Sequence, residues 1–148
     1  MIDIETIMST DLITVSADEN LDTARVLMRN NRIHHLLVVD GGEKLLGILS
    51  LSDLLAATDS FLREEESRLH PRDTKVQEVM ITDLATVDEH ANIRQAALFL
   101  EKHRIGCLPV VTDGKLRGII TDTDFIGVAI NLLEQLESME PVDLEDVD

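Results

Sequence analysis

The chain has 148 residues and a hydrophobic fraction of 44%, enough for one domain or two small packed halves. Its net charge of −16 argues against a broad duplex-binding surface, and the lack of Trp and Tyr argues against base stacking, so nucleic acid is not an expected partner. With no bilayer-length apolar run and no signal-like N-terminus, we expect a cytoplasmic protein that does not bind membranes.

The first half of the chain predicts a strand, a helix, two strands and a second helix. A short apolar run at 12–15 favours a strand, and apolar residues at three-and-four spacing over 21–28 favour a helix with one buried face. Asp18 is a candidate cap for that helix. Apolar runs at 36–39 and 45–49 flank a glycine turn, which predicts a hairpin, and the second helix begins near Ser50.

The second half repeats this order. Strands are expected at 84–87, 108–111 and 116–120, with a helix over 93–100 capped by Asp88 and a last helix from Thr121. The repeat offset is 72 before the hairpin turn and 71 after it, so one residue differs in the turn. An internal repeat over nearly the whole chain is its most informative feature. Matching pairs include Asn20 and Asn92, Arg32 and Arg104, Gly47 and Gly118, and Asp53 and Asp124.

Each repeat closes on glycine, two aliphatic residues, a hydroxyl and, three residues later, an aspartate. Ser50 with Asp53, and Thr121 with Asp124, therefore stand at expected helix N-termini. This spacing is that of a capping box, with Asp in place of Glu or Gln, which would need no ligand. A carboxylate at such a place can also accept hydrogen bonds from ribose hydroxyls, as in dinucleotide-binding folds. Both interpretations stay open at this point.

The order of elements, the glycine hairpin, the closing motif and the duplication resemble a tandem pair of cystathionine β-synthase (CBS) domains, a Bateman module, over about residues 2–135. The resemblance implies an α+β fold: two pseudo-symmetric β-α-β-β-α repeats packed as one module, each with a small mixed sheet and two helices. The expected segments are repeat 1 at 1–60, a charged helical linker at 61–74, repeat 2 at 75–136 and an acidic disordered tail at 137–148.

In many members of this family, adenosine nucleotides bind in two clefts between the repeats, so the resemblance implies two candidate sites. The expected contacts are ribose bonds to the hydroxyl and aspartate, adenine bonds to main chain and basic groups near phosphate. One cleft would combine Ser50, Asp53, Thr82, Leu84, Arg104, Ile105, Gly106 and Cys107, where the small Gly106 and Cys107 leave room for a base. The other would combine Thr121, Asp124, Thr10, Leu12, Ile33, His34 and His35.

His34 and His35 are expected near the phosphate position of the second cleft, so ligand binding there should depend on pH. Neutral imidazole attracts phosphate less than arginine does, so we expect binding there to strengthen as pH falls through the histidine pKa. A metal site is not expected, because His34 and His35, as neighbours in a strand, would point to opposite faces.

No catalytic motif is present, so the leading hypothesis is a non-catalytic regulatory module that senses AMP, ADP, ATP or S-adenosylmethionine. The alternative is a ligand-free interaction module that acts through homodimerisation and an unknown protein partner. Apolar positions along the second helices, 51–61 and 125–136, would supply the dimer contacts.

Overall fold

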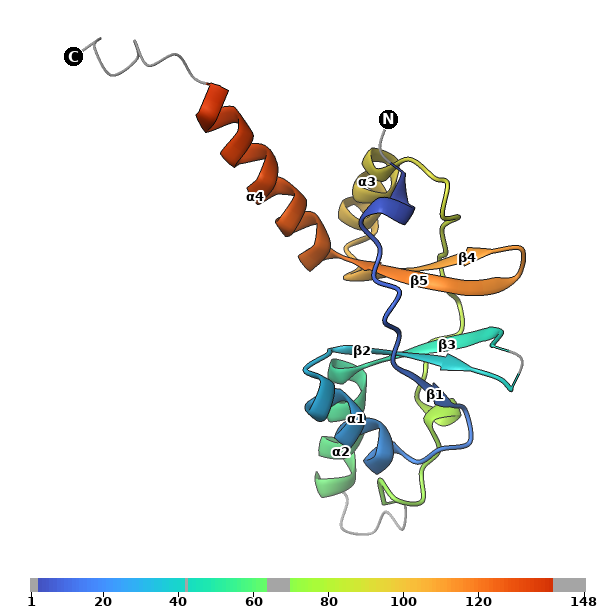
Figure 1. Ribbon diagram of the computed structural model, residues 1–148. Helices are drawn as coiled ribbons and strands as arrows, with labels where there is room; N and C mark the ends of the chain where they lie inside the picture. The colour runs from blue at the N-terminus through green and yellow to red at the C-terminus, as the bar shows by residue number, and fades with distance from the viewer. Residues whose placement is uncertain (1–2, 42, 64–69, 140–148) are drawn as a thin grey trace, which may run out of the picture.

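Each half of the chain folds into a β-hairpin with helices on its outer side, and the two hairpins face each other (Figure 1). The structure is a computed structural model that describes residues 3–41, 43–63 and 70–139. The first half contains η1 (Ile4–Thr6), β1 (Thr14–Ser16), α1 (Leu21–Asn31), β2 (His35–Val39), β3 (Leu45–Ser50) and α2 (Leu51–Arg63). The second contains η2 (Val76–Glu78), α3 (Ile93–His103), β4 (Cys107–Thr112), β5 (Lys115–Thr121) and α4 (Asp122–Met139). The α+β class and the two-repeat order are confirmed.

The first half has the expected mixed sheet, in the order β1-β2-β3. β1 runs parallel to β2, with Thr14 opposite Leu37, and β2 pairs antiparallel with β3. β1 begins two residues later than the strand expected at 12–15, and Leu12 instead packs between the two hairpins.

The second half departs from the expected mixed sheet, since its sheet has only the strands β4 and β5 in the part of the chain that the structure describes. The strand expected at 84–87 is reduced to one parallel bridge between Val87 and Val110. Pro109, which stands where the first half has Leu37, has no N–H to donate to the segment before Val87. The parallel ladder therefore stops after one bridge.

The helix caps also differ from the expectation. Asn20 caps α1 by accepting a bond from the Thr23 N–H at 2.8 Å, and Asn92 caps α3 by accepting one from the Arg94 N–H at 2.7 Å. Asp18 and Asp88 lie outside those caps. The Asp88 carboxylate instead accepts bonds from the His90 N–H at 2.8 Å and from the Thr112 hydroxyl at 3.1 Å.

The segments that lead into each half cross over to pack on the other half. Ile4 is fully buried in the core of the second half, and Val76 is fully buried in the core of the first. Ser9 then pairs with Ile119 of β5 through two backbone hydrogen bonds of 2.9 and 3.0 Å. Ile81 makes the same two-bond pair with Ile48 of β3.

The repeated glycines make this crossing possible. A Cβ on Gly118 would lie 2.8 Å from the Ser9 carbonyl oxygen, and a Cβ on Gly47 would lie 2.8 Å from that of Ile81. Real Cβ atoms essentially never approach another atom this closely. The glycine of the closing motif is therefore needed for the approach of the crossing segment.

A third apolar cluster joins the two hairpins. Its buried members are Leu37, Ile48 and Cys107, and partly buried leucines from both halves surround them. The two repeats therefore pack as one module around a shared core.

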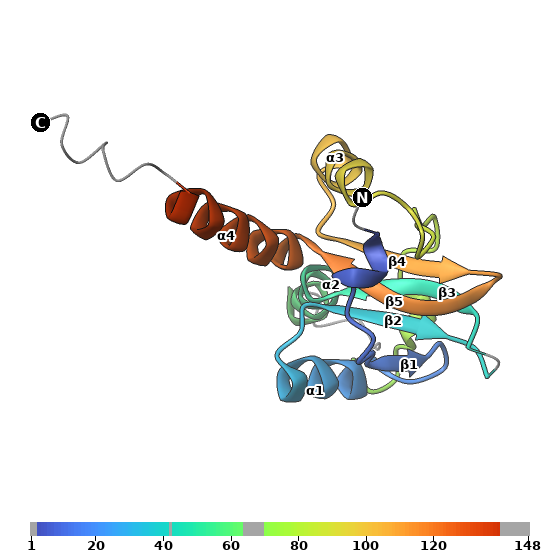
Figure 2. The same ribbon diagram turned by 45° about the horizontal axis from the view of Figure 1, so that its top comes forward.

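α4 leads away from this module in both views (Figures 1 and 2). None of its residues is buried, and its exposed apolar side chains include Ile126, Ile130 and Leu133. It begins beside Thr121 as expected and continues through Met139, into the segment 137–148 expected as a tail. The rest of that tail, and positions 64–69 of the expected linker, lie outside the described residues.

Candidate ligand-binding site

A cavity of about 350 Å³ opens where the N-terminal segment, the start of β2 and the end of β5 meet. Small-molecule sites have volumes of roughly 300–1,000 Å³, so the cavity is at the lower end of that range. Of the seven residues expected for the second cleft, six line it: Leu12, Ile33, His34, His35, Thr121 and Asp124. Thr10, the seventh, is exposed and is not among its lining residues.

Thr121 and Asp124 form a reciprocal cap at the start of α4. The Thr121 N–H donates to the Asp124 carboxylate at 2.8 Å, and the Asp124 N–H donates to the Thr121 hydroxyl at 3.3 Å. The capping interpretation is therefore correct for this pair. Because a carboxylate has about four acceptor positions, Asp124 retains acceptor capacity toward the cavity that it lines.

His35 is half-buried at the point where the two halves meet. Its Cε1 lies 3.3 Å, and the Asp122 carboxylate 3.7 Å, from the position that a Cβ on Gly106 would take. Burial lowers the pKa of His35 most, the charge of His34 lowers it further, and the carboxylates of Asp122 and Asp53 oppose that shift. His35 is therefore held toward its neutral form in the free protein.

Both histidines line the same cavity, which corrects the expectation that they would point to opposite faces. β2 begins at His35, so His34 lies before the strand and does not follow its alternation. The His34 carbonyl also accepts a 2.8 Å bond from the Leu51 N–H, which ties this segment to the start of α2.

The cavity carries more negative than positive groups. Asp11, Asp122 and Asp124 line it together with one guanidinium, that of Arg32. Arg32 is the left-handed C-cap of α1, with φ of 53°, and is exposed. These charged groups would therefore present a net repulsive field to an anionic ligand.

Eight of the lining residues had no place in the expected set. Five of them are polar: Ser9, Asp11, Arg32, Asp122 and Thr123. The repeat carried a signal for Arg32, because its counterpart Arg104 was assigned to the other cleft. Ser9 and Asp11 had no such signal, since they reach the cavity only through the crossing of the N-terminal segment.

The residues expected for the other cleft lie in different surroundings. Ser50 caps α2 by accepting a 3.0 Å bond from the Asp53 N–H. Leu84 and Cys107 pack in the cluster between the hairpins, and Ile105 packs against the core of the second half. Thr82 and Arg104 are exposed, and the His35 ring lies beside Gly106, where room for a base was expected.

No helix in the described ranges 3–41, 43–63 and 70–139 has the length and apolar character to cross a bilayer.

The profile of the CBS domain family matches the chain twice, at residues 4–60 and 76–131. A CBS domain-containing protein of Dictyostelium discoideum is 35% identical over 139 residues, covering 88% of this chain and 93% of that protein. Four other curated relatives are longer proteins, of whose length the chain spans 22–42%.

Two solved structures are similar to the whole chain. A Vibrio cholerae protein named for acetoin utilization has a TM-score of 0.80 and 42% identity, covering 95% of this chain and 99% of that one. The structure of CBSX2 in complex with AMP has a TM-score of 0.77 and 27% identity, covering 89% of this chain and 98% of that one.

Proposed function

This chain belongs to the CBS domain family, and we propose that it is a non-catalytic regulatory module whose cavity binds an adenosine ligand: AMP, ADP, ATP or S-adenosylmethionine. The ligand would lie between the start of α4 in the second repeat and residues 32–35 of the first. The observation that carries the proposal is the cavity that gathers Thr121 and Asp124 with Ile33 and His35 from the other repeat.

The chemistry of the lining suits an adenosine group. Asp124 offers acceptor positions for ribose hydroxyls, and Ile33 with Leu12 gives aliphatic walls for a base. A relative at 27% identity was solved with AMP, which makes this ligand the first to test.

The charges of the cavity predict an order among the ligands. Three carboxylates against one guanidinium oppose a triphosphate at neutral pH and oppose a monophosphate less. S-Adenosylmethionine carries positive charge and would not meet this repulsion. Protonation of His35, whose pKa is lowered mainly by burial, would offset one of the three carboxylates, so binding of AMP and ATP should tighten as pH falls through the His35 pKa.

Thermal unfolding followed by circular dichroism, with each ligand and with none, tests the proposal. A ligand at about 100 times its Kd stabilises the native state by roughly 2.7 kcal/mol, which a melting curve resolves easily. Asp124→Asn should weaken the response. It is measured against the variant's own unliganded melting temperature, because loss of the charge also weakens the bond from the Thr121 N–H that caps α4. Asp53→Asn is the matched control at the other closing motif. Equal weakening by both variants would assign binding to both clefts, and no response to any ligand would refute the proposal.

A second function, as an interaction module through homodimerisation, is favoured by α4. The helix has 18 residues, none of them buried, and Ile126, Ile130 and Leu133 are 59%, 50% and 58% exposed. Their spacing of four and three residues makes an apolar stripe along one helix face, which is suited to packing against a second copy.

Light scattering at tens of micromolar tests this second function. We expect a dimer that Ile130→Asp dissociates, because the substitution would bury a charge in the interface. Asn131→Asp adds the same charge to the neighbouring exposed position and should leave the dimer intact. A monomeric parent protein would exclude this function and would leave the ligand proposal standing.

A further inference from the structure

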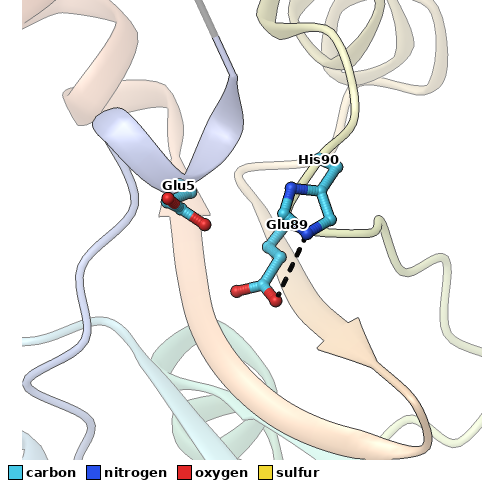
Figure 3. A group of neighbouring side chains, drawn as sticks. All are labelled: Glu5, Glu89 and His90. Atoms are coloured by element: carbon cyan, nitrogen blue, oxygen red, sulfur yellow. Dashed lines mark ion pairs between the residues drawn. The ribbon is translucent and has the colours of Figure 1, made fainter.

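Two carboxylates and one imidazole meet where the N-terminal turn lies against the loop before α3. Glu5, Glu89 and His90 each offer one ligand atom, and these atoms all lie within 4.8 Å of one another (Figure 3). His90 Nε2 is 3.8 Å from Glu89 Oε1. We propose that this group, which we call the Glu5–Glu89–His90 triad, binds a divalent first-row transition-metal ion. The proposal is independent of the adenosine site.

The backbone holds the two segments of the triad together without any ion. The Glu5 N–H donates to the Glu89 carbonyl at 3.1 Å, and the Ile4 N–H donates to the Ala91 carbonyl at 3.2 Å. Ile4 is fully buried, which anchors the turn that carries Glu5.

The loop that carries the other two ligands is braced from behind. Thr112 of β4 accepts a bond from the Glu89 N–H at 3.2 Å and donates its hydroxyl to Asp88 at 3.1 Å. The Asp88 carboxylate also accepts the His90 N–H at 2.8 Å. These bonds fix the backbone from which the Glu89 and His90 side chains extend.

The other half of the molecule has the same backbone arrangement without the ligands. There the Gln77 N–H donates to the Ala17 carbonyl at 3.0 Å, as Glu5 does to Glu89. The Val76 N–H likewise donates to the Glu19 carbonyl at 2.8 Å. At the offset of 72, the three ligand positions hold Gln77, Ala17 and Asp18. The fold therefore needs the backbone bonds but not a Glu-Glu-His triad, whose presence calls for another explanation.

The charges of the triad favour a cation. Two carboxylates lie close together, and among the described residues no Lys or Arg forms an ion pair with either. Like charges at this separation repel, and a divalent ion would remove the repulsion. Zn–N and Zn–O bonds are roughly 2.0–2.2 Å, so tetrahedral ligand atoms lie about 3.4 Å apart. Glu89 and His90 are already within about half an ångström of that separation.

The mixture of ligands selects the class of ion. An imidazole with carboxylates suits zinc and its first-row neighbours, whereas magnesium and calcium prefer oxygen ligands alone. Three protein ligands leave at least one coordination position to water.

A bound ion would fasten the N-terminal segment of the first repeat to the second repeat. That segment continues to Ser9, which lines the candidate cavity. Metal binding outside the cavity should therefore reduce the motion of the N-terminal segment that forms one side of it.

The test is zinc binding to the full chain, with any affinity tag removed, measured by competition with a chelating dye. We expect one zinc per chain, and a loss of affinity of about tenfold or more in Glu5→Gln, Glu89→Gln and His90→Gln, because each substitution removes a direct ligand. Glu19→Gln, in the corresponding loop of the first half, is the matched control and should bind as the parent does. Magnesium in excess should not displace the zinc.

Hydrogen exchange gives a second, structural measurement on the same samples. Zinc should slow amide exchange at residues 4–9 in the parent and not in His90→Gln. The proposal is overturned if the parent takes up no zinc at millimolar concentration. It is equally overturned if the variant carrying all three substitutions keeps the parent's affinity, since the ion would then bind elsewhere.

Discussion

Substituting alanine for Gly118 tests the crossing of the N-terminal segment over β5. The new Cβ would lie 2.8 Å from the Ser9 carbonyl oxygen and 2.9 Å from the Met8 sulfur. The Met8 side chain can rotate away, but the Ser9 oxygen belongs to the backbone. It must retreat by about 0.6 Å to reach 3.4 Å, where ordinary contacts begin. That movement loosens both hydrogen bonds between Ser9 and Ile119.

The expected loss of stability follows from these contacts. Two backbone hydrogen bonds contribute roughly 1–3 kcal/mol together, and overpacking costs a similar ~1–3 kcal/mol. The loss of the hydrogen bonds and the overpacking arise from the same displacement of Ser9, so the two costs are not simply added. We take their combined cost as about 3 kcal/mol. The smaller entropy of the unfolded alanine chain offsets ~0.4–1 kcal/mol, which leaves a net loss of about 2 kcal/mol. For a chain of this size the melting temperature should fall by about 4–8 °C.

Two other glycines provide matched controls. Gly47→Ala meets the Ile81 carbonyl at the same 2.8 Å and should cost the same stability. Gly127→Ala meets nothing within 4 Å and lies in α4, so it should stabilise the helix by roughly 0.5–1 kcal/mol. Gly118→Ala should also weaken ligand binding, because Ser9 and Ile119 line the cavity, whereas Gly47→Ala should not.

Urea unfolding followed by far-ultraviolet circular dichroism is the assay, since the chain has neither Trp nor Tyr for intrinsic fluorescence. A Gly118→Ala protein within 0.5 kcal/mol of the parent would refute the reasoning, because the close approach would then carry no energetic weight. A stabilised Gly118→Ala protein, resembling Gly127→Ala, would refute it more strongly.

Three further predictions concern single side chains. The pKa of His35 is lowered mainly by burial, so on acidification the unfolded chain binds the proton before the folded chain does. The free energy of unfolding should therefore decrease as pH falls below about 6.5. Urea unfolding at several pH values between 5 and 7 should show a weaker dependence of this free energy on pH in His35→Gln than in the parent. Burial, with a smaller effect of Asp122, raises the pKa of Cys107 to about 11. At pH 8, iodoacetamide should therefore alkylate Cys107 slowly in the native protein and rapidly in the urea-unfolded protein. Equal alkylation rates in the two states would contradict the burial. Asn92→Ala should cost about 1 kcal/mol of unfolding free energy by removing the α3 cap, whereas Asp88→Ala, which removes no cap, should leave the α3 amides as protected from hydrogen exchange as in the parent.

Much of the fold could be predicted because the repeat stated each pattern twice. The hairpins and the helices α1 and α3 lie where apolar periodicity indicated them, since that periodicity reflects burial directly. Six residues of one cleft also meet as expected, because the closing motif fixes the start of α4 and the hairpin fixes β2.

What could not be predicted depends on contacts between segments distant in the sequence. Pro109 looks tolerable in a hairpin strand, and its effect appears only when the parallel neighbour near Val87 is known. Likewise, the His35 ring lies beside Gly106 because of how the halves pack, which no local pattern records. The helix caps show a different limit. Near the start of each helix the chain has both an Asp (Asp18 or Asp88) and an Asn (Asn20 or Asn92), and either residue type can serve as the N-cap, so the residue type alone did not identify the Asn caps.

The crossing of the segments that contain Ile4 and Val76 affects how the protein folds during its synthesis. Ile4 is synthesised long before Ala96, Leu108 and Ile120, which build the core that buries it. The core of the first repeat likewise remains incomplete until Val76 has been synthesised. Neither repeat, cut out alone, contains the residues that complete it. The pair should therefore fold and unfold in a single cooperative step, and only after most of the chain has been synthesised.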